Sequence, residues 1–150
     1  MHPSLIRGRH WLGVALLLAL TAAAQAAEIG QVKVARGHVV VERQGKTQPA
    51  TVGARLQAAD IVRTGTDGAV GITMDDDSLL SAGPNSELVL DRYAVDATTN
   101  QARFDTTLNK GTLSVISGRI AKQAPGAMTV RTPNAILGAR GTEFVVSADE

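Results

Sequence analysis

Apolar and polar side chains alternate with a period of two residues along most of this chain, and that pattern leaves few folds open. For example, Val70, Ile72 and Met74 alternate with Gly71 and Thr73. Successive side chains of a β-strand point to opposite faces, so the pattern gives each strand one face for a core and one for water. Past the first 27 residues no stretch keeps apolar residues at helical spacing for three turns. We therefore expect an all-β fold without a helix.

Turn residues interrupt the alternation at short intervals. The gaps between them hold one strand of roughly four to eight residues each. Asp67 and Gly68 form the clearest turn signal, because Asp-Gly tolerates the positive φ values of a tight hairpin, so the strands around it should pair. Two short continuous runs, Val39-Val40-Val41 and Ser114-Val115-Ile116, predict deep strands that are covered on both faces.

The composition favours a thin architecture over a thick one. Aromatic residues make up only 3% of the chain, too few to fill a wide core between two sheets, whereas small residues suit closely stacked strands. We expect an elongated β-solenoid-like or strand-wound stack of short strands, with a β-sandwich as the alternative. Phe104 and Phe144 are the expected aromatic core residues. No linker or low-complexity tract divides the chain after residue 26, so residues 27–150 should form a single domain.

The first 26 residues have the three-part order of a secretory signal peptide. Arg7 and Arg9 precede an apolar run at 11–20, and small residues end in Ala24-Gln25-Ala26. The apolar run is shorter than the ~20 residues that an uncleaved membrane anchor needs. We expect cleavage after Ala26, a periplasmic product that begins at Ala27, and no stable membrane insertion after cleavage.

Several kinds of chemistry lack the residues they require. The chain has no cysteine, which removes disulfides and thiolate metal ligands. His38 is the only histidine after residue 26, so neither a Ser-His-Asp triad nor a zinc site can be completed, and we expect His38 to be a solvated surface residue. The sequence therefore predicts no enzyme, no catalytic residue, no cofactor and no metal.

Charge gives no sign of nucleic acid as a partner. Of 15 basic residues Arg7 and Arg9 leave with the signal peptide, so 13 face 14 acidic residues. The basic residues are scattered and few aromatic residues accompany them, which argues against nucleic-acid binding. The one concentrated charge, Asp75-Asp76-Asp77, lacks the glycine-spaced ligand loop of a calcium site, and we expect a solvated turn.

A long polar stretch, 96–103, predicts an exposed excursion between two strands and the most mobile loop of the domain. Tyr93 borders it and offers a large contact area with a polar tip. We name Tyr93, Thr98 and Asn100 as candidate partner contacts.

Three short motifs carry a family resemblance. They are the Asp-x-Val-x-Thr-Gly step at 60–65, the Thr-Pro-x-Ala turn at 132–135 and the Arg-Gly-Thr-x-Phe segment at 140–144, with Lys-Gly-Thr-Leu at 110–113 between them. This order resembles the FecR-type domain family of bacterial cell-envelope proteins over residues 30–146. The resemblance marks a structural signature made of Asp60, Thr64, Gly65, Gly111, Pro133, Arg140, Gly141 and Thr142.

The signature residues also have a physical reading. Gly65 and Gly141 suit turns or close backbone approaches, where a residue without Cβ is favoured. Pro133 should end a strand, because it removes an amide donor. The Arg140 guanidinium could bind loop carbonyls or a carboxylate such as that of Asp60, and we expect it to organise the fold, with ligand binding as the alternative.

The resemblance implies a domain that relays a signal between envelope proteins. The leading hypothesis is an exported, non-enzymatic interaction or signalling module in the periplasm. Its partner would be another cell-envelope protein, a receptor or a membrane sensor, bound through loops or by strand addition at an open sheet edge. The alternative is a cell-wall or carbohydrate-binding module.

Overall fold

The computed structural model describes residues 25–96, 98–141 and 143–149. Most of the described backbone is β-strand, and one short helix is present. The elements are β1 (Glu28–Arg36), β2 (Val39–Arg43), β3 (Lys46–Pro49), β4 (Arg55–Gln57), β5 (Ile61–Thr64), β6 (Ala69–Met74), β7 (Leu79–Ala82), β8 (Glu87–Asp96), β9 (Gln101–Ile116), α1 (Arg119–Gln123), β10 (Met128–Arg131), β11 (Ile136–Ala139) and β12 (Glu143–Ala148). The all-β prediction is confirmed.

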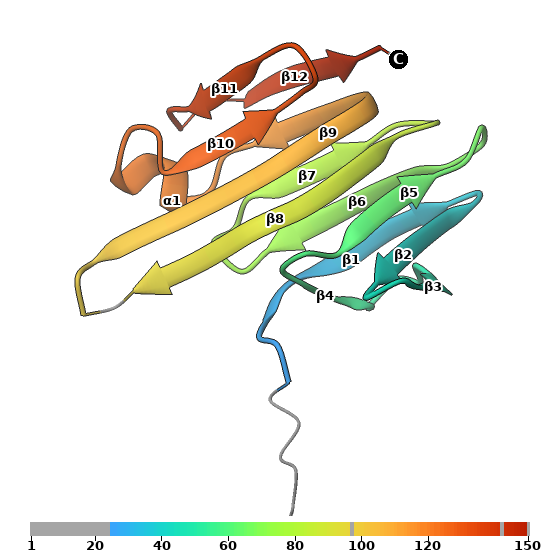
Figure 1. The fold of residues 1–150 in the computed structure, drawn as a ribbon, viewed down its shortest axis with the longest axis horizontal. Coiled ribbons are helices and arrows are strands. Elements are labelled where there is room, and N and C mark those ends of the chain that lie inside the picture. The colour runs from blue at the N-terminus through green and yellow to red at the C-terminus, as the bar shows by residue number, and fades with distance from the viewer. Residues whose placement is uncertain (1–24, 97, 142, 150) are drawn as a thin grey trace, which may run out of the picture.

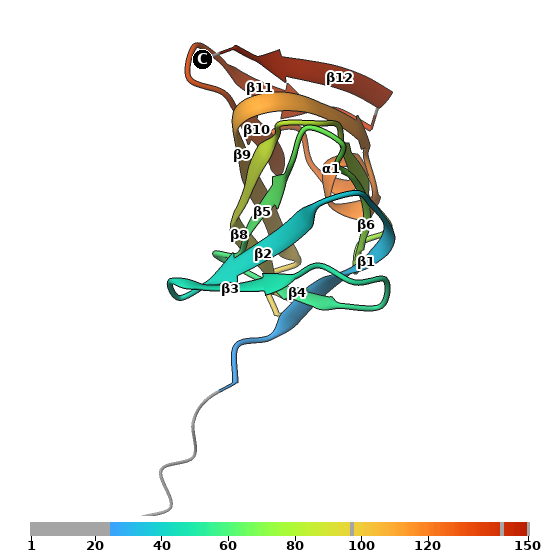
Figure 2. The same cartoon turned by 90° about the vertical axis from the view of Figure 1, so that its right-hand side faces the viewer.

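One continuous path of strands curls around the core. Its order is β3-β2-β5-β8-β9-β7-β6-β1-β4, and the pairs along it are antiparallel. The 16-residue β9 turns the path, because its first part pairs with β8 and β10 and its last part pairs with β7 and β12. Figure 2 shows the strands closing around the interior like a half-barrel. This arrangement fits both the strand-wound stack and the sandwich alternative.

The core is filled by the inward faces of these strands. In β6, for example, Val70, Ile72 and Met74 are each 2% exposed, as the alternation predicts. Phe104 is fully buried, whereas Phe144 is half-buried and packs against the core. Aliphatic side chains from many short strands thus do most of the filling.

The two continuous runs do not lie deepest. Val39 and Val41 are buried, but Val40 between them is half-buried, and Ile116 is 43% exposed. Both runs belong to strands with one outward face, so the alternation of the strand governs burial even where apolar residues are adjacent.

The turn at Asp67-Gly68 is not a β-hairpin. It joins β5 to β6, but β5 pairs with β2 and β8, whereas β6 pairs with β1 and β7. Neither residue has a positive φ, and the Gly68 amide donates to the Gly65 carbonyl at 3.0 Å. The turn therefore carries the chain from one side of the curled sheet to the other.

The structure corrects two further expectations. A helix does occur, the five-residue α1, with Ile120 and Ala121 buried. The polar stretch 96–103 is largely exposed, but both of its ends are strand and residues 98–100 form a turn: Asp96 ends β8 and pairs with Gln101, the first residue of β9. β8 and β9 continue past the sheet as a two-stranded arm, visible at the lower left of Figure 1. We call residues 92–96 and 101–105 the distal ribbon.

The predicted signal peptide lies outside the described residues, except for Gln25 and Ala26, which are exposed and precede β1. Within the described part of the chain, no helix is long and apolar enough to cross a membrane.

Candidate interaction site

A cleft of about 450 Å³ opens beside the distal ribbon. The ribbon forms one wall, the turn between β6 and β7 together with α1 forms the other, and the start of β1 closes one end. The lining residues are Ala27, Glu28, Ile29, Asp75, Asp76, Tyr93, Val95, Ala102, Arg119, Ile120 and Gln123.

The ribbon wall presents one aromatic and one aliphatic side chain. Tyr93 and Val95 are two residues apart on β8 and so share a face. Tyr93 pairs with Phe104 across the ribbon, and the two rings meet edge to face with centroids 5.3 Å apart. Val95 pairs with Ala102 and is 64% exposed. The ribbon therefore holds Tyr93 against the core and leaves Val95 open to a partner.

The surroundings of Tyr93 disfavour ionisation of its phenol. Burial raises its pKa well above the ordinary value, and the carboxylates of Asp76 and Asp75 raise it further. The phenol is therefore neutral at physiological pH. It can offer a hydroxyl group to the cleft.

The opposite wall is built on Asp76, and here the sequence-based prediction of a solvated turn is wrong in part. Residues 75–77 form a turn, and its two outer members are exposed. Asp76 is only 3% exposed. Its carboxylate accepts hydrogen bonds from the Ser78 amide at 3.1 Å, the Ser78 hydroxyl at 2.8 Å and the Ile120 amide at 3.2 Å. Three donors make burial of this charge tolerable.

Gly118 completes the same wall. Its amide donates to the Ser78 Oγ at 2.9 Å, and the next amide, of Arg119, donates to the Asp76 carbonyl at 2.8 Å. A Cβ at position 118 would lie 2.2 Å from the Asp76 carbonyl oxygen, so only glycine fits. We call Asp76, Ser78, Gly118 and Ile120 the Asp76 junction, because together they fasten α1 to the turn between β6 and β7.

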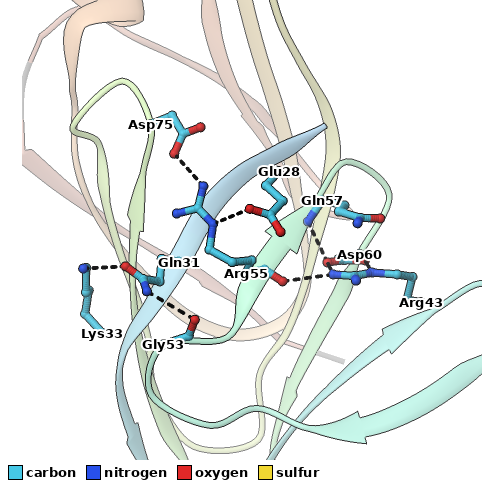
Figure 3. Close-up of polar contacts among 9 residues, drawn as sticks. All are labelled: Glu28, Gln31, Lys33, Arg43, Gly53, Arg55, Gln57, Asp60 and Asp75. Carbon is cyan, nitrogen blue, oxygen red and sulfur yellow. Dashed lines mark hydrogen bonds and ion pairs between the residues drawn. The ribbon is translucent and has the colours of Figure 1, made fainter. Parts of the chain in front are cut away.

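Charged groups at the rim are paired with one another. Arg55 donates to Glu28 at 2.8 Å and lies 3.6 Å from the Asp75 carboxylate, as Figure 3 shows. Arg119 donates to the Asp75 carbonyl at 2.7 Å and lies 3.3 Å from the Asp77 carboxylate. Such exposed pairs add little stability. They do leave the cleft with an apolar floor and a rim of nearly balanced charge.

A second cleft, of about 510 Å³, lies against the other face of the ribbon. Because side chains of a strand alternate, β8 gives its even-numbered residues to this cleft and its odd-numbered residues to the first. The lining residues are Arg92, Ala94, Asp96, Asn100, Gln101, Ala102, Arg103, Ile120, Gln123, Ala124 and Ala127.

The candidate partner contacts all lie on this arm, but they do not form one cluster. Tyr93 lines the first cleft, Asn100 lines the second, and Thr98 is exposed at the tip. The Asp96 carboxylate accepts from the Thr98 amide at 2.9 Å and from the Thr99 amide at 3.2 Å. These bonds lower the pKa of Asp96 and tie the turn to the ribbon.

Asp60, the first signature residue, is an internal anchor. It is completely buried and accepts two hydrogen bonds from the Arg43 guanidinium, at 2.8 and 2.7 Å, and one from the Gln57 amide at 2.8 Å (Figure 3). The hydrogen bonds to Asp60 raise the pKa of Arg43 above its usual value. The suggested contact with Arg140 is not formed, since Arg140 is exposed and makes no hydrogen bond or ion pair with any residue that the structure describes.

Three other signature residues, distant in sequence, meet around Ser86. The Thr64 hydroxyl donates to the Gly83 carbonyl at 2.6 Å and accepts from the Ser86 amide at 2.9 Å. The Gly65 carbonyl accepts a hydrogen bond from the amide of Asn85, the residue before Ser86, at 3.0 Å. Gly111 has φ of 92°, and a Cβ there would lie 2.1 Å from the Ser86 Oγ. This corner is where β9 changes its partner strands.

The remaining signature residues lie near the C-terminus. Pro133 follows β10, which ends at Arg131, and the Thr132 amide closes the turn on the Ala135 carbonyl at 2.8 Å. Gly141 has φ of 69°, in the left-handed region that favours glycine. Thr142 lies outside the described residues.

Sequence reasoning missed the Asp76 junction and Ser86. Asp76 stands between two exposed carboxylates, and its burial depends on amides more than 40 positions later in the chain. Ser86 had a usable signal, because a small polar residue directly before an apolar strand is typical of a side chain that bonds to the backbone of a turn.

The described residues of the site do not form a metal-binding or triad-type cluster. Among the residues described, no three His, Cys, Asp or Glu side chains gather in a way that could hold a metal ion. His38 is exposed in the turn before β2 and lines neither cleft beside the ribbon. The buried acids Asp60 and Asp76 are engaged by structural donors.

Fold and site together define an all-β domain whose buried polar residues hold the frame and whose exposed ribbon borders two clefts. The sequence model of the family described as FecR protein matches residues 60–150, more than half of the chain, and the chain belongs to that family. FecR domains occur in signalling and sensing proteins, and the family is regulatory and not known for enzymes. No curated protein and no solved structure matches the chain.

Proposed function

We propose that this chain is an exported, non-enzymatic module that binds another protein of the cell envelope, a receptor or a membrane sensor, in the periplasm. The signal-peptide pattern that ends at Ala26 supports export, and membership in a family of signalling proteins supports a protein partner. The first cleft and the distal ribbon are the contact surface. Tyr93, Thr98 and Asn100 belong to that surface.

The observation that carries this proposal is the exposure of Val95 on a two-stranded arm. Val95 is 64% exposed, and its burial by a partner would lower the free energy because apolar area would be removed from water. Ile29 and Ile120 line the same cleft, so an apolar side chain of a partner would be enclosed between the two walls. Because the charges at the rim are paired with one another, they should repel an approaching partner only weakly.

Cell-wall or carbohydrate binding is the weaker alternative. Sugar rings stack on the open face of an aromatic side chain. Tyr93 is the only tyrosine of the chain, and its ring packs edge to face with Phe104 and is half-buried. Among the described residues, the two phenylalanines are core or half-buried, so no observation favours this alternative.

Site-specific photo-crosslinking in the intact cell tests the proposal. A photoreactive amino acid at Thr98 should give a discrete adduct with a second protein, whereas the same group at Thr47, exposed on β3, should give none. When Val95→Lys is added to the variant that carries the photoreactive amino acid at position 98, the adduct should disappear and the melting temperature should not change. The recovered chain should begin at Ala27.

Two results would count against the proposal. An adduct of equal yield in the presence of Val95→Lys would place the contact outside the first cleft. Recovery of the chain with residues 1–26 attached, in the cytoplasm, would remove the envelope partner altogether.

A further inference from the structure

The ends of the sheet path are protected against pairing with another strand. Open edges present unpaired amides and carbonyls, and proteins guard them with Lys, Pro or very short strands. β3 at one end begins with Lys46 and ends with Pro49. β4 at the other end has only three residues, Arg55–Gln57.

β12 lacks these protections. It has six residues, Glu143–Ala148, and none of them is Lys, Arg or Pro. It pairs only with β9, and no strand among the described residues covers its other edge. Figure 1 places β12 at the periphery, away from the ribbon tip. This edge is therefore available for strand addition.

Exposed apolar side chains gather beside this edge. Val145 on β12 is 66% exposed and pairs with Ser114 of β9. On the neighbouring strands, Leu79 of β7 is 40% exposed and pairs with Ile116 of β9, which is 43% exposed. A surface of this kind next to an open edge points to an interface.

We infer that β12 pairs in antiparallel register with β12 of a second copy of this chain, around a two-fold axis at Val145. A continued sheet keeps side chains of paired residues on the same face, so odd-numbered residues must face odd-numbered ones. This register sets Val145 opposite its equivalent and Phe144 opposite Val146. Glu143 then faces Ser147 of the second copy.

Side-chain chemistry selects this register over its two neighbours. A two-fold axis at Phe144 would set the exposed Val145 opposite the charged Glu143 of the second copy. A two-fold axis at Val146 would also keep the faces matched, but it would set Glu143 opposite Asp149 of the second copy on both sides of the axis. Like charges directly opposite each other destabilise a pair of strands. In the Val145 register no carboxylate faces another. The edge can therefore pair with itself without like-charge repulsion, as a two-fold interface requires.

The inferred dimer leaves the binding surface open. No residue of β12 lines either cleft beside the ribbon. Each dimer would carry two ribbons, and it could engage two partner molecules at once. The inference does not depend on the proposed function, because its tests involve the chain alone.

Single-cysteine variants test the register, since the chain has no cysteine of its own. Residues directly opposite each other in an antiparallel pair have Cα atoms about 5 Å apart, within the range of a disulfide. The Cα atoms of the two Ser147 residues would be about 13 Å apart, because four residues separate 147 from the position that faces it. Val145→Cys should form a disulfide-linked dimer under mild oxidation, whereas Ser147→Cys should stay monomeric. Equal linkage of both variants, or faster linkage of Ser147→Cys, would overturn the inferred register.

Charge substitutions test the association itself. By sedimentation equilibrium, Val145→Lys should weaken dimerisation at least tenfold, because two lysines would face each other on the axis. Ser147→Lys should maintain or strengthen it, because each lysine would face Glu143. Both positions are exposed, so neither change should alter the melting temperature. A wild-type chain that stays monomeric at all accessible concentrations would overturn the inference.

Discussion

The two walls of the first cleft differ in how they are held. The Asp76 junction is buried, every polar group that the structure shows there has a partner, and a glycine is required at its centre. The distal ribbon is mostly exposed. Its outer part consists only of β8 paired with β9, whereas β10 pairs with its base at Phe104 and Asp105. At that base Phe104 is buried in the core and Tyr93 packs against it, and the Thr129 hydroxyl donates to the Asp105 carboxylate at 2.6 Å.

This difference separates stability from recognition. Changes at the junction should act on folding, because they leave buried donors or acceptors unpaired. Changes at the exposed positions of the ribbon, such as Val95, should act on binding, because those side chains are not buried. A cleft with one rigid wall and one exposed wall can vary its specificity on the ribbon without endangering the fold.

The largest effect is expected from Gly118→Ala. The new Cβ would lie 2.2 Å from the Asp76 carbonyl oxygen and 2.4 Å from the Ser78 amide nitrogen, so the junction would have to open. We expect a loss of about 3 kcal/mol in the free energy of unfolding, measured by urea denaturation. Gly138→Ala is the matched control, since the nearest heavy atom is 4.0 Å away, and it should change stability by less than about 0.5 kcal/mol. Equal midpoints for both variants would contradict the rigid junction.

A smaller loss is expected from Asp76→Ala. The substitution deprives three donors of their acceptor, on Ser78 and Ile120, and should cost about 2 kcal/mol. Asp75→Ala removes the neighbouring exposed carboxylate, which lies 3.6 Å from Arg55, and should cost less than about 1 kcal/mol. If the two variants unfold at the same urea concentration, Asp76 behaves as the solvated residue that the sequence suggests.

The smallest effect is confined to high pH and concerns Tyr93, where the two walls influence each other. Its pKa is raised in the folded state by burial and by Asp76 and Asp75, whereas the unfolded chain should titrate near 10. Below about pH 10 the phenol is protonated in both states and has no effect. Above it the unfolded chain releases the proton first, so stability should fall as pH rises.

Two measurements check this expectation. As the only tyrosine, Tyr93 should show a tyrosinate absorbance midpoint well above 10 in the folded protein. Between pH 9 and 11 the wild-type chain should lose more unfolding free energy than Tyr93→Phe. A tyrosinate midpoint near 10 in the folded protein would show that Tyr93 is neither buried nor close to the carboxylates of Asp75 and Asp76.

The strands themselves could be predicted because their signal is local. The alternation in β6 and the end of β10 before Pro133 depend on residues a few positions apart. The pairing of strands could not be predicted in the same way. Asp67-Gly68 has the chemistry of a hairpin turn, yet β5 and β6 have other partners, because each strand pairs with whichever neighbours best bury its apolar face.

The candidate site shows the same division. Tyr93 and the exposed stretch beside it could be recognised from polarity, although the stretch folds as a ribbon. The burial of Asp76 could not, because its donors at Ser78 and Ile120 meet only after β7 and β9 have paired. The partner of Asp60 is likewise Arg43, 17 positions earlier, on a strand that only tertiary pairing brings near.

The sequence by itself determined the all-β class, the family and the absence of cysteine chemistry, because composition, motif order and period-two alternation are properties of neighbouring residues. Tertiary structure alone decided which strands pair, which carboxylates are buried, and where the clefts and the open β12 edge lie. The reason is physical: burial, close approach and edge exposure are relations between segments distant in the chain, and they arise only once the sheet has curled around its core.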